Sequence, residues 1–405
     1  MPLSASWSFP WVAHLRWLAV AAVCFNHISA SLLKLPQPFV SPFLSRGPAD
    51  FGIAVLFVAS GFVIQSSYRH RLRFGSGWLG AAARFWIKRL LARWPAVALI
   101  VVVDLCVSSF PLAAQRHAVA HSLPSFLTLT QNWSYGLQGN GTTVFPFASA
   151  NIAWLGSTLW FLHLVYPFVG PSLARVRLWW IGAAVLAAVV IGHLVVQIWL
   201  AVSLPELTRY ATDHFGAKAA ENPSSVYSFY KWISFYCPYV RLFEFMAGLG
   251  AAVFYGRYLA HVTRKRQRTV VWLTLIAGLG CWGVAEQWNT PKGVEVGAHI
   301  YHYDLIAVAL VWLAAIGTEC PRLEGVASSS LLRWSSSAYL LWMWHLVWFN
   351  AYALPVWAGP TTPRDWMFIW GRLVLLCGFA IVTSVGIDRL LSAVRLCVRD
   401  KLSLG

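Results

Sequence analysis

The sequence predicts an all-α, polytopic integral membrane protein with about ten transmembrane helices. Hydrophobic residues make up 58% of the 405 residues, charged residues only 11%, and the mean hydropathy is +0.60. Soluble domains are about 25% charged, so composition alone excludes an ordinary soluble protein. Apolar segments of roughly 20 residues recur along nearly the whole chain, which leaves no room for a large soluble domain. Residues 1–405 are therefore expected to form a single transmembrane domain.

The predicted spans are apolar runs that end where charged residues, prolines or polar segments begin. Each run is long enough to cross the hydrocarbon core as a helix, since about 20 residues suffice. In chain order, the expected spans are residues 11–33, 50–67, 87–110, 152–173, 178–203, 236–256, 270–288, 300–318, 334–354 and 368–394.

Three connecting segments stand out. Residues 68–86 are basic and contain Gly75-Ser76-Gly77, which indicates a flexible connector. Residues 111–151 and 204–235 are long and polar, and loops of this length are more often functional than plain connectors.

The positive charges set the expected orientation in the membrane. The 31 Lys and Arg residues give a formal net charge of +17, and most fall in alternate connecting segments or at the matching span ends. Because positively charged loops stay in the cytoplasm, both termini are expected there, including a C-terminal tail at about 395–405. The basic excess is thus explained by topology, so the lipid bilayer is an expected partner and nucleic acid is not. We expect a multi-pass protein of the inner (plasma) membrane.

Cysteine and tryptophan indicate structural roles. The seven Cys residues are scattered without CxxC or CxxH spacing, so they are interpreted as small hydrophobes and no metal site is expected. Most of the 24 Trp residues lie near predicted span ends, where they are interpreted as interfacial anchors.

Arg16 and His27 form an unusual pair within the first apolar segment. A charged and a titratable residue inside a membrane span are costly, so chance explains them poorly. Eleven helical residues turn through about 1100°, which leaves both side chains within about 20° of one face and ~16 Å apart along the axis. This geometry suits an anionic ligand at the cytoplasmic end and chemistry at the other.

Six motifs follow one another along nearly the whole chain: Arg16 to His27 with ten residues between them, Phe51 to Phe62 including Ser60-Gly61, Phe85 to Ala96, Leu159 to Leu162, Arg241 to Phe245 followed by Gly248, and Ala338 to His345. In content and order they resemble the membrane-bound acyltransferase-3 family. The small pair Ser60-Gly61 lacks the setting of a hydrolase nucleophile and favours close helix packing.

The resemblance implies transfer of an acyl group, commonly acetyl from acetyl-coenzyme A, to a hydroxyl of a cell-surface glycan or small molecule. Coenzyme A is cytoplasmic and anionic, so its phosphates need cations at the inner face. The candidates for these cofactor contacts are Arg16, Lys88, Arg89 and Arg93. A neutral His27 is expected to take the proton from the acceptor hydroxyl as a general base, with an acyl-histidine relay as the alternative.

Further polar residues are candidates near the outer side. Arg241 and Glu244, spaced i, i+3, can form an ion pair, and a structural role is weighed equally with a functional one. In the functional interpretation, Glu244 orients His27 or binds the acceptor. Arg241, His302 and Asp304 are acceptor-binding candidates, whereas His163 is given no role.

The expected function is a membrane O-acyltransferase that moves an acyl group from cytoplasmic acyl-coenzyme A to a hydroxyl of an envelope or exported glycan. Envelope-biosynthesis proteins are its expected partners. Acylation of a small molecule such as a macrolide remains an alternative. Two alternatives from other classes are a glycan transporter or flippase and a scaffold subunit, although the paired half-repeats of many transporters are absent from the sequence.

Overall fold

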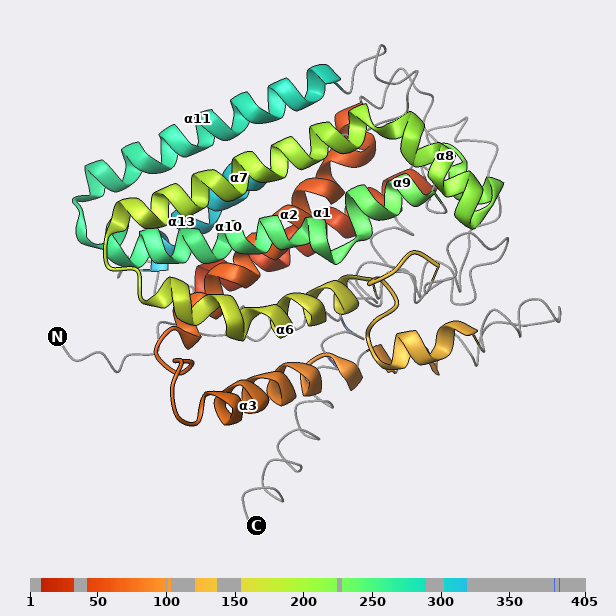
Figure 1. The fold of residues 1–405 in the computed structure, drawn as a ribbon. Helices are drawn as coiled ribbons and strands as arrows, with labels where there is room; N and C mark the ends of the chain where they lie inside the picture. The colour runs from red at the N-terminus through yellow and green to blue at the C-terminus, as the bar shows by residue number, and fades with distance from the viewer. Residues whose placement is uncertain are drawn as a thin grey trace.

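The computed structural model describes residues 9–32, 42–95, 97–98, 101–102, 121–136, 154–223, 228–288, 302–318, 382 and 386, without the side chains of 24–32, 42–48, 286–288 and 318. All regular secondary structure in these ranges is helical, which confirms the all-α prediction for this part of the chain (Figure 1). The predicted span 334–354 lies outside the described residues, and of the span 368–394 only residues 382 and 386 are described.

Several of the helices can cross a membrane by length and composition. In the described part of the chain, four helical stretches satisfy both criteria: Ala49–Tyr68, Trp179–Val202, Phe229–His261 and Arg264–Ala285. A shorter apolar helix covers Asp304–Gly317. These stretches match the predicted spans 50–67, 178–203, 236–256, 270–288 and 300–318 in order.

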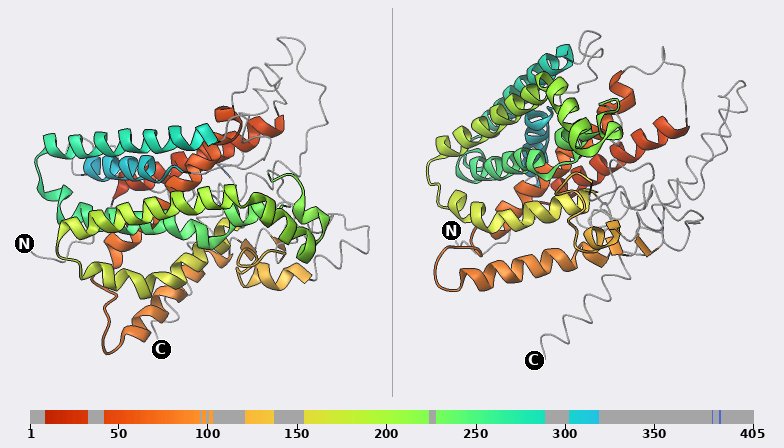
Figure 2. Two further views of the ribbon diagram at one scale, coloured as in Figure 1. Left: turned by 45° about the horizontal axis from the view of Figure 1, so that its top comes forward. Right: turned by 45° about the vertical axis from the view of Figure 1, so that its right-hand side comes forward.

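Two helices form the centre of the bundle and the others pack around them (Figures 1 and 2). The central pair is α2 (Pro42–Tyr68) and α10 (Pro238–Arg257). Around it lie α1 (Pro10–Leu32), α6 (Trp154–Ala174), α7 (Trp179–Val202) and α13 (Asp304–Thr318), with α11 (Arg264–Trp288) packed on α13.

Glycines allow the central pair to approach closely. A Cβ added to Gly61 of α2 would meet the backbone oxygen of Phe245, and one added to Gly248 of α10 would meet the backbone oxygen of Val58. Membrane helices associate through small residues in this way, because lipid provides no hydrophobic drive for helix contact. The close packing predicted at Ser60-Gly61 is therefore confirmed.

Helix α3 (Trp78–Leu91) corrects the predicted third span. The connector after α2 ends at Gly77, whose left-handed φ of 85° starts the helix nine residues before the predicted limit at 87. Arg84 interrupts the apolar run of residues 78–86, so hydropathy assigns them to the basic connector although they contain no proline and are helical. Arg89 consequently lies eleven residues into a helix, about 16 Å from its first residue.

The two prolines inside α6 explain how α3 docks. Pro167 and Pro171 lack N–H groups, so the carbonyls of His163 and Pro167, four residues earlier, receive no helical hydrogen bond. Trp86 Nε1 donates to the His163 carbonyl at 3.1 Å, and Trp78 Nε1 donates to the Pro167 carbonyl at 3.2 Å. Backbone groups in a membrane need partners within the protein, so the two indoles fix α3 against α6.

Three basic connections gather at one end of the bundle, which we call the basic end (Figures 1 and 2). They join α2 to α3, α6 to α7 and α10 to α11. Arg257 at the end of α10 donates from Nε to the Val176 carbonyl at 3.0 Å, which ties two of these connections together.

The described parts of the two long polar segments pack together at the opposite end. They comprise residues 121–136 and the α8–α9 region, which runs from α8 (Leu204–Phe215) through α9 (Phe229–Lys231) to the π-helical turn Trp232–Tyr236, apart from residues 224–227. Asn132 donates from Nδ2 to the Tyr236 carbonyl at 2.5 Å, and Trp232 donates from Nε1 to the Asn132 carbonyl at 3.3 Å. The two segments therefore form one structural unit.

The substitution Gly248→Ala is expected to destabilise the protein by about 1–3 kcal/mol, because the added methyl group collides with the α2 backbone. Thermal unfolding of the purified protein in detergent measures this effect. Gly280→Ala in α11, where a Cβ meets nothing within 4 Å, is the matched control. Equal stability of the two variants would contradict the proposed close contact.

The substitution Trp86→Phe keeps the ring and removes the N–H group, leaving the His163 carbonyl without its donor. The expected loss of stability is about 1–3 kcal/mol, the penalty of a buried unsatisfied polar group. Trp180→Phe, which changes a side chain that is 54% exposed on α7, serves as the control. An unchanged unfolding temperature for Trp86→Phe would show that the hydrogen bond does not fix α3.

Candidate functional site

Four cationic or titratable side chains from three segments meet inside the bundle, and we call them the arginine cluster. Arg16 comes from α1, Arg89 and Arg93 from α3 and its C-terminal extension, and His163 from α6. His163 is fully buried, and the charges of Arg93, Arg89 and Arg16 all act on its imidazole. The helix packing described above thus brings together residues far apart in the sequence.

Hydrogen bonds and an aromatic ring hold the cluster in place. Arg93 Nη2 lies 3.5 Å from His163 Nε2, and Arg93 Nη1 donates to the Arg89 carbonyl at 3.3 Å. The Arg89 guanidinium lies over the Tyr68 ring, 5.0 Å from its centroid. His163, which the sequence left without a role, is therefore a direct neighbour of the predicted cofactor-binding arginines.

The positive charge of Arg16 and Arg89 has no carboxylate counterpart in the described part of the chain. The ion pairs found there involve other residues, and the charges of Arg16 and Arg89 repel each other. The buried Nε atoms of both arginines and Nδ1 of His163 have no hydrogen-bond partner there. Buried charges are costly unless paired, so the cluster favours an anionic ligand.

Lys88 and His27 are the other two residues predicted to bind the cofactor or to take part in the reaction. Lys88 is exposed on α3, whereas Arg89 and Arg93 are directed into the bundle. The backbone of His27 belongs to α1, the helix that also carries Arg16, as predicted. The His27 side chain lies outside the described residues, so its role remains a prediction.

The basic end carries a positive electrostatic potential of its own. Burial, followed by the charges of Arg69, Arg73 and Arg257, lowers the pKa of His70. Burial penalises the charged imidazole, and the three neighbouring guanidiniums repel a further positive charge. An anion at this end therefore meets favourable charge.

A second group of polar residues lies in the half of the bundle away from the basic end. Arg241 Nη1 donates to Glu244 Oε1 at 2.5 Å, and both side chains are at most 2% exposed. Arg241 also donates from Nε to the Phe235 carbonyl at 2.6 Å. The predicted i, i+3 ion pair is confirmed.

The remaining members of this group come from α7 and α13. His193 Nδ1 lies 2.7 Å from Asp304 Oδ2, and His302 is buried beside them with its ring centroid 5.7 Å from that of His193. Asp304 and His193 both interact electrostatically with Glu244. We call Arg241, Glu244, His193, His302 and Asp304 the outer cluster.

Sequence reasoning missed His193 and its neighbour Gln197. The two polar residues are one helical turn apart in a span that is otherwise almost entirely apolar. In a membrane helix this spacing indicates a buried polar face, so the signal was present in the sequence. The Gln197 Nε2 group donates to the Ser234 carbonyl at 3.1 Å and lies 3.3 Å from His193 Nε2.

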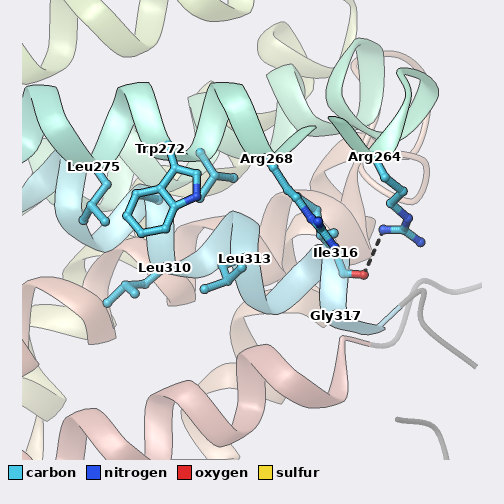
Figure 3. A pocket seen from close by; sticks show the side chains of 10 residues that line it. Arg264, Arg268, Trp272, Leu275, Leu310, Leu313, Ile316 and Gly317 are labelled. Atoms are coloured by element: carbon cyan, nitrogen blue, oxygen red, sulfur yellow. Dashed lines mark hydrogen bonds between the residues drawn. The ribbon is translucent and has the colours of Figure 1, made fainter. Parts of the chain in front are cut away.

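A groove of about 290 Å³ between α11 and α13 is separate from both clusters. Figure 3 shows Trp272, Leu275, Leu310 and Leu313 along it, with Arg264 at one end donating to the Ile316 carbonyl. None of the arginine-cluster or outer-cluster residues lines this groove. The groove is therefore not assigned to the candidate site.

Comparison with known proteins indicates an activity class. The chain is similar to acyltransferase MdmB of Streptomyces mycarofaciens, with 23% identity over 346 residues that cover 82% of this chain and 77% of that protein. No protein-family model matches the chain, and no solved structure matches it. The similarity supports a transferase activity of the acyltransferase kind.

The substitution Glu244→Ala is expected to cost about 3–5 kcal/mol of stability, because it leaves the Arg241 charge buried and unpaired. Glu221→Ala removes the carboxylate of an exposed i, i+3 pair with Lys218 and should cost less than about 1 kcal/mol. Thermal unfolding of both variants in one detergent gives the comparison. Similar losses for both would mean that the Arg241–Glu244 pair is effectively solvated.

Proposed function

We propose that this protein is a multi-pass O-acyltransferase of the inner (plasma) membrane. In this proposal, an acyl group, acetyl in the simplest case, moves from cytoplasmic acyl-coenzyme A to a hydroxyl of an envelope or exported glycan. The similarity to an acyltransferase supports the reaction class. The apolar helices support a location in the membrane.

The convergence of Arg16 and Arg89 carries the proposal. These guanidiniums come from helices far apart in sequence, interact electrostatically, and lack a carboxylate partner in the described residues. Coenzyme A carries phosphate groups, which arginine binds through charge-assisted hydrogen bonds. Arg93, whose Nη2 lies 3.5 Å from His163 Nε2, is the third arginine of the cluster.

The positive charge at the basic end supports the proposed direction of transfer. If this end faces the cytoplasm, as the positive-inside rule favours, the donor enters past Arg69, Arg73 and Arg257. The acceptor would approach from the opposite end, where residues 121–136 pack against the α8–α9 region. Arg241, His302 and Asp304 lie in that half and are the proposed acceptor-side residues.

The proposed chemistry places His27 between donor and acceptor. His27, further along α1 than Arg16, would take the proton from the acceptor hydroxyl as its oxygen attacks the thioester carbonyl. The carbon–sulfur bond breaks, the acyl group stays on the acceptor oxygen, and the coenzyme A thiolate leaves and takes up the proton. Glu244 would orient His27 or bind the acceptor.

The variants Arg16→Ala and Arg89→Ala are expected to weaken coenzyme A binding by about 10-fold to 100-fold each, the effect of losing a charge-assisted hydrogen bond. Calorimetry on the purified protein in detergent measures the dissociation constant. Arg84→Ala, an exposed arginine on the same helix, is the control and should change it little. Equal weakening by all three would indicate only general attraction to a basic surface.

The variant His27→Ala is expected to lower acyl transfer by about 10²-fold to 10⁴-fold while coenzyme A still binds, because only proton transfer is removed. Radiolabelled acetyl-coenzyme A and extracted envelope glycans provide the assay. His261→Ala at the basic end is the control. Full transfer by His27→Ala would refute its role as base, and mass spectrometry of the products separates glycan from small-molecule acceptors.

A further inference from the structure

Three side chains of the outer cluster have the composition of a metal site. His193 comes from α7, whereas His302 and Asp304 lie at the start of α13, and both helices pack against α10. Their ligand-capable atoms all lie within 4.8 Å of one another. The side chains are at most 2% exposed. Any occupant of this closed group is therefore no larger than a water molecule or a single ion.

Several buried atoms around this point lack partners in the described part of the chain. They are both ring nitrogens of His302, Oδ1 of Asp304 and Oε2 of Glu244. A buried polar atom without a hydrogen bond is unfavourable, and more so in a membrane protein, where water is excluded from the apolar core. The unpartnered set contains one imidazole and two carboxylate oxygens, all of which can ligate a cation.

The hydrogen bonds of Gln197 fix the protonation of His193. The Gln197 amide nitrogen donates to the Ser234 carbonyl at 3.1 Å, so the group that faces His193 Nε2 at 3.3 Å is also a donor. His193 Nε2 must therefore accept, and the ring proton lies on Nδ1, directed at Asp304 Oδ2. His193 is then neutral, and two carboxylates, Asp304 and Glu244, share the single guanidinium of Arg241.

The geometry points to a divalent transition-metal ion, with zinc as the expected metal, bound by His193, His302 and Asp304. A proton on His302 would supply charge but would create two N–H donors, neither of which has an acceptor among the described residues. A metal ion instead uses the free lone pairs of His302 and Asp304. Zinc takes two histidines and one carboxylate at about 2.0–2.2 Å and keeps a fourth position open.

His193 can complete the site by changing its tautomer. The ring proton moves from Nδ1 to Nε2, so that Nδ1 offers its lone pair to the metal and the imidazole stays neutral. Gln197 Oε1, which is buried without a partner in the described residues, can accept the Nε2 proton once the amide turns, which gives up its hydrogen bond to the Ser234 carbonyl. Ligand atoms around a tetrahedral zinc lie roughly 3.4 Å apart, so side-chain shifts of the order of 1 Å suffice.

The bound ion would join α7 to the first turn of α13 at the proposed acceptor side. It would be a resident ion, and its binding would not depend on coenzyme A or on the proposed acyl transfer. Metal binding is therefore measured without acyl donor or acceptor. The protein can then prove to transfer acyl groups without binding metal, or to bind metal without transferring acyl groups, and the two proposals are tested separately.

The test uses the full chain, purified in detergent with its affinity tag removed, treated with EDTA, incubated with zinc and desalted. Mass spectrometry of the metals is expected to give about one zinc per chain for the wild type and less than about a tenth of this for His302→Ala. His302 has no hydrogen bond in the described residues, so its truncation should disturb the fold least. His261→Ala is the matched control and should retain the metal.

Cobalt provides a measurement that does not depend on any variant. Addition of Co²⁺ to the EDTA-treated wild type should produce visible absorption of a four-coordinate nitrogen–oxygen site, and zinc should abolish it. Zinc should also raise the unfolding temperature of the wild type but not that of His302→Ala. Folded wild type that binds no metal, or His302→Ala that binds as much as the wild type, would overturn the proposal.

Discussion

The structure depends on two backbone carbonyls that the prolines of α6 set free. Pro167 and Pro171 remove hydrogen bonds that the helix would otherwise make, and a membrane provides no water to replace them. Trp86 and Trp78 of α3 provide the donors. Because these indoles fix the rotation and depth of α3, they also determine that Arg89 and Arg93 face His163 and Arg16. A local defect in one helix thus positions the charged side chains of another.

The arginine cluster and the outer cluster carry unbalanced charges of opposite sign. Around His163, Arg16 and Arg89 have no carboxylate partner among the described residues, so a bound anion would stabilise them. In the outer cluster, two carboxylates face one guanidinium and two imidazoles, so the same argument calls for a cation. Desolvation makes both imbalances costly. Unmatched charge in an apolar bundle therefore indicates which kind of ligand each end takes.

Sequence patterns predicted those features that depend on near neighbours in the chain. The i, i+3 spacing predicted the Arg241–Glu244 pair, and small residues predicted close helix packing at Ser60-Gly61, although only the structure identifies α10 as the partner helix. Hydropathy failed at the start of α3, because the exposed Arg84 interrupts the apolar run of residues 78–86 although the helix is continuous there. His193 and Gln197 were overlooked although their spacing on an apolar helix was visible.

For the described residues, the sequence by itself determined the all-helical class, the order of the helices and the shared helix of Arg16 and His27, since apolar length and helical periodicity are local properties. Only the tertiary structure decided that His163 joins the arginines and that Asp304 meets His193, 111 residues away. No local sequence pattern predicts these long-range contacts, because they depend on which helix faces pack together. The packing, in turn, follows from backbone details such as Gly248 against Val58 and the freed carbonyls of α6.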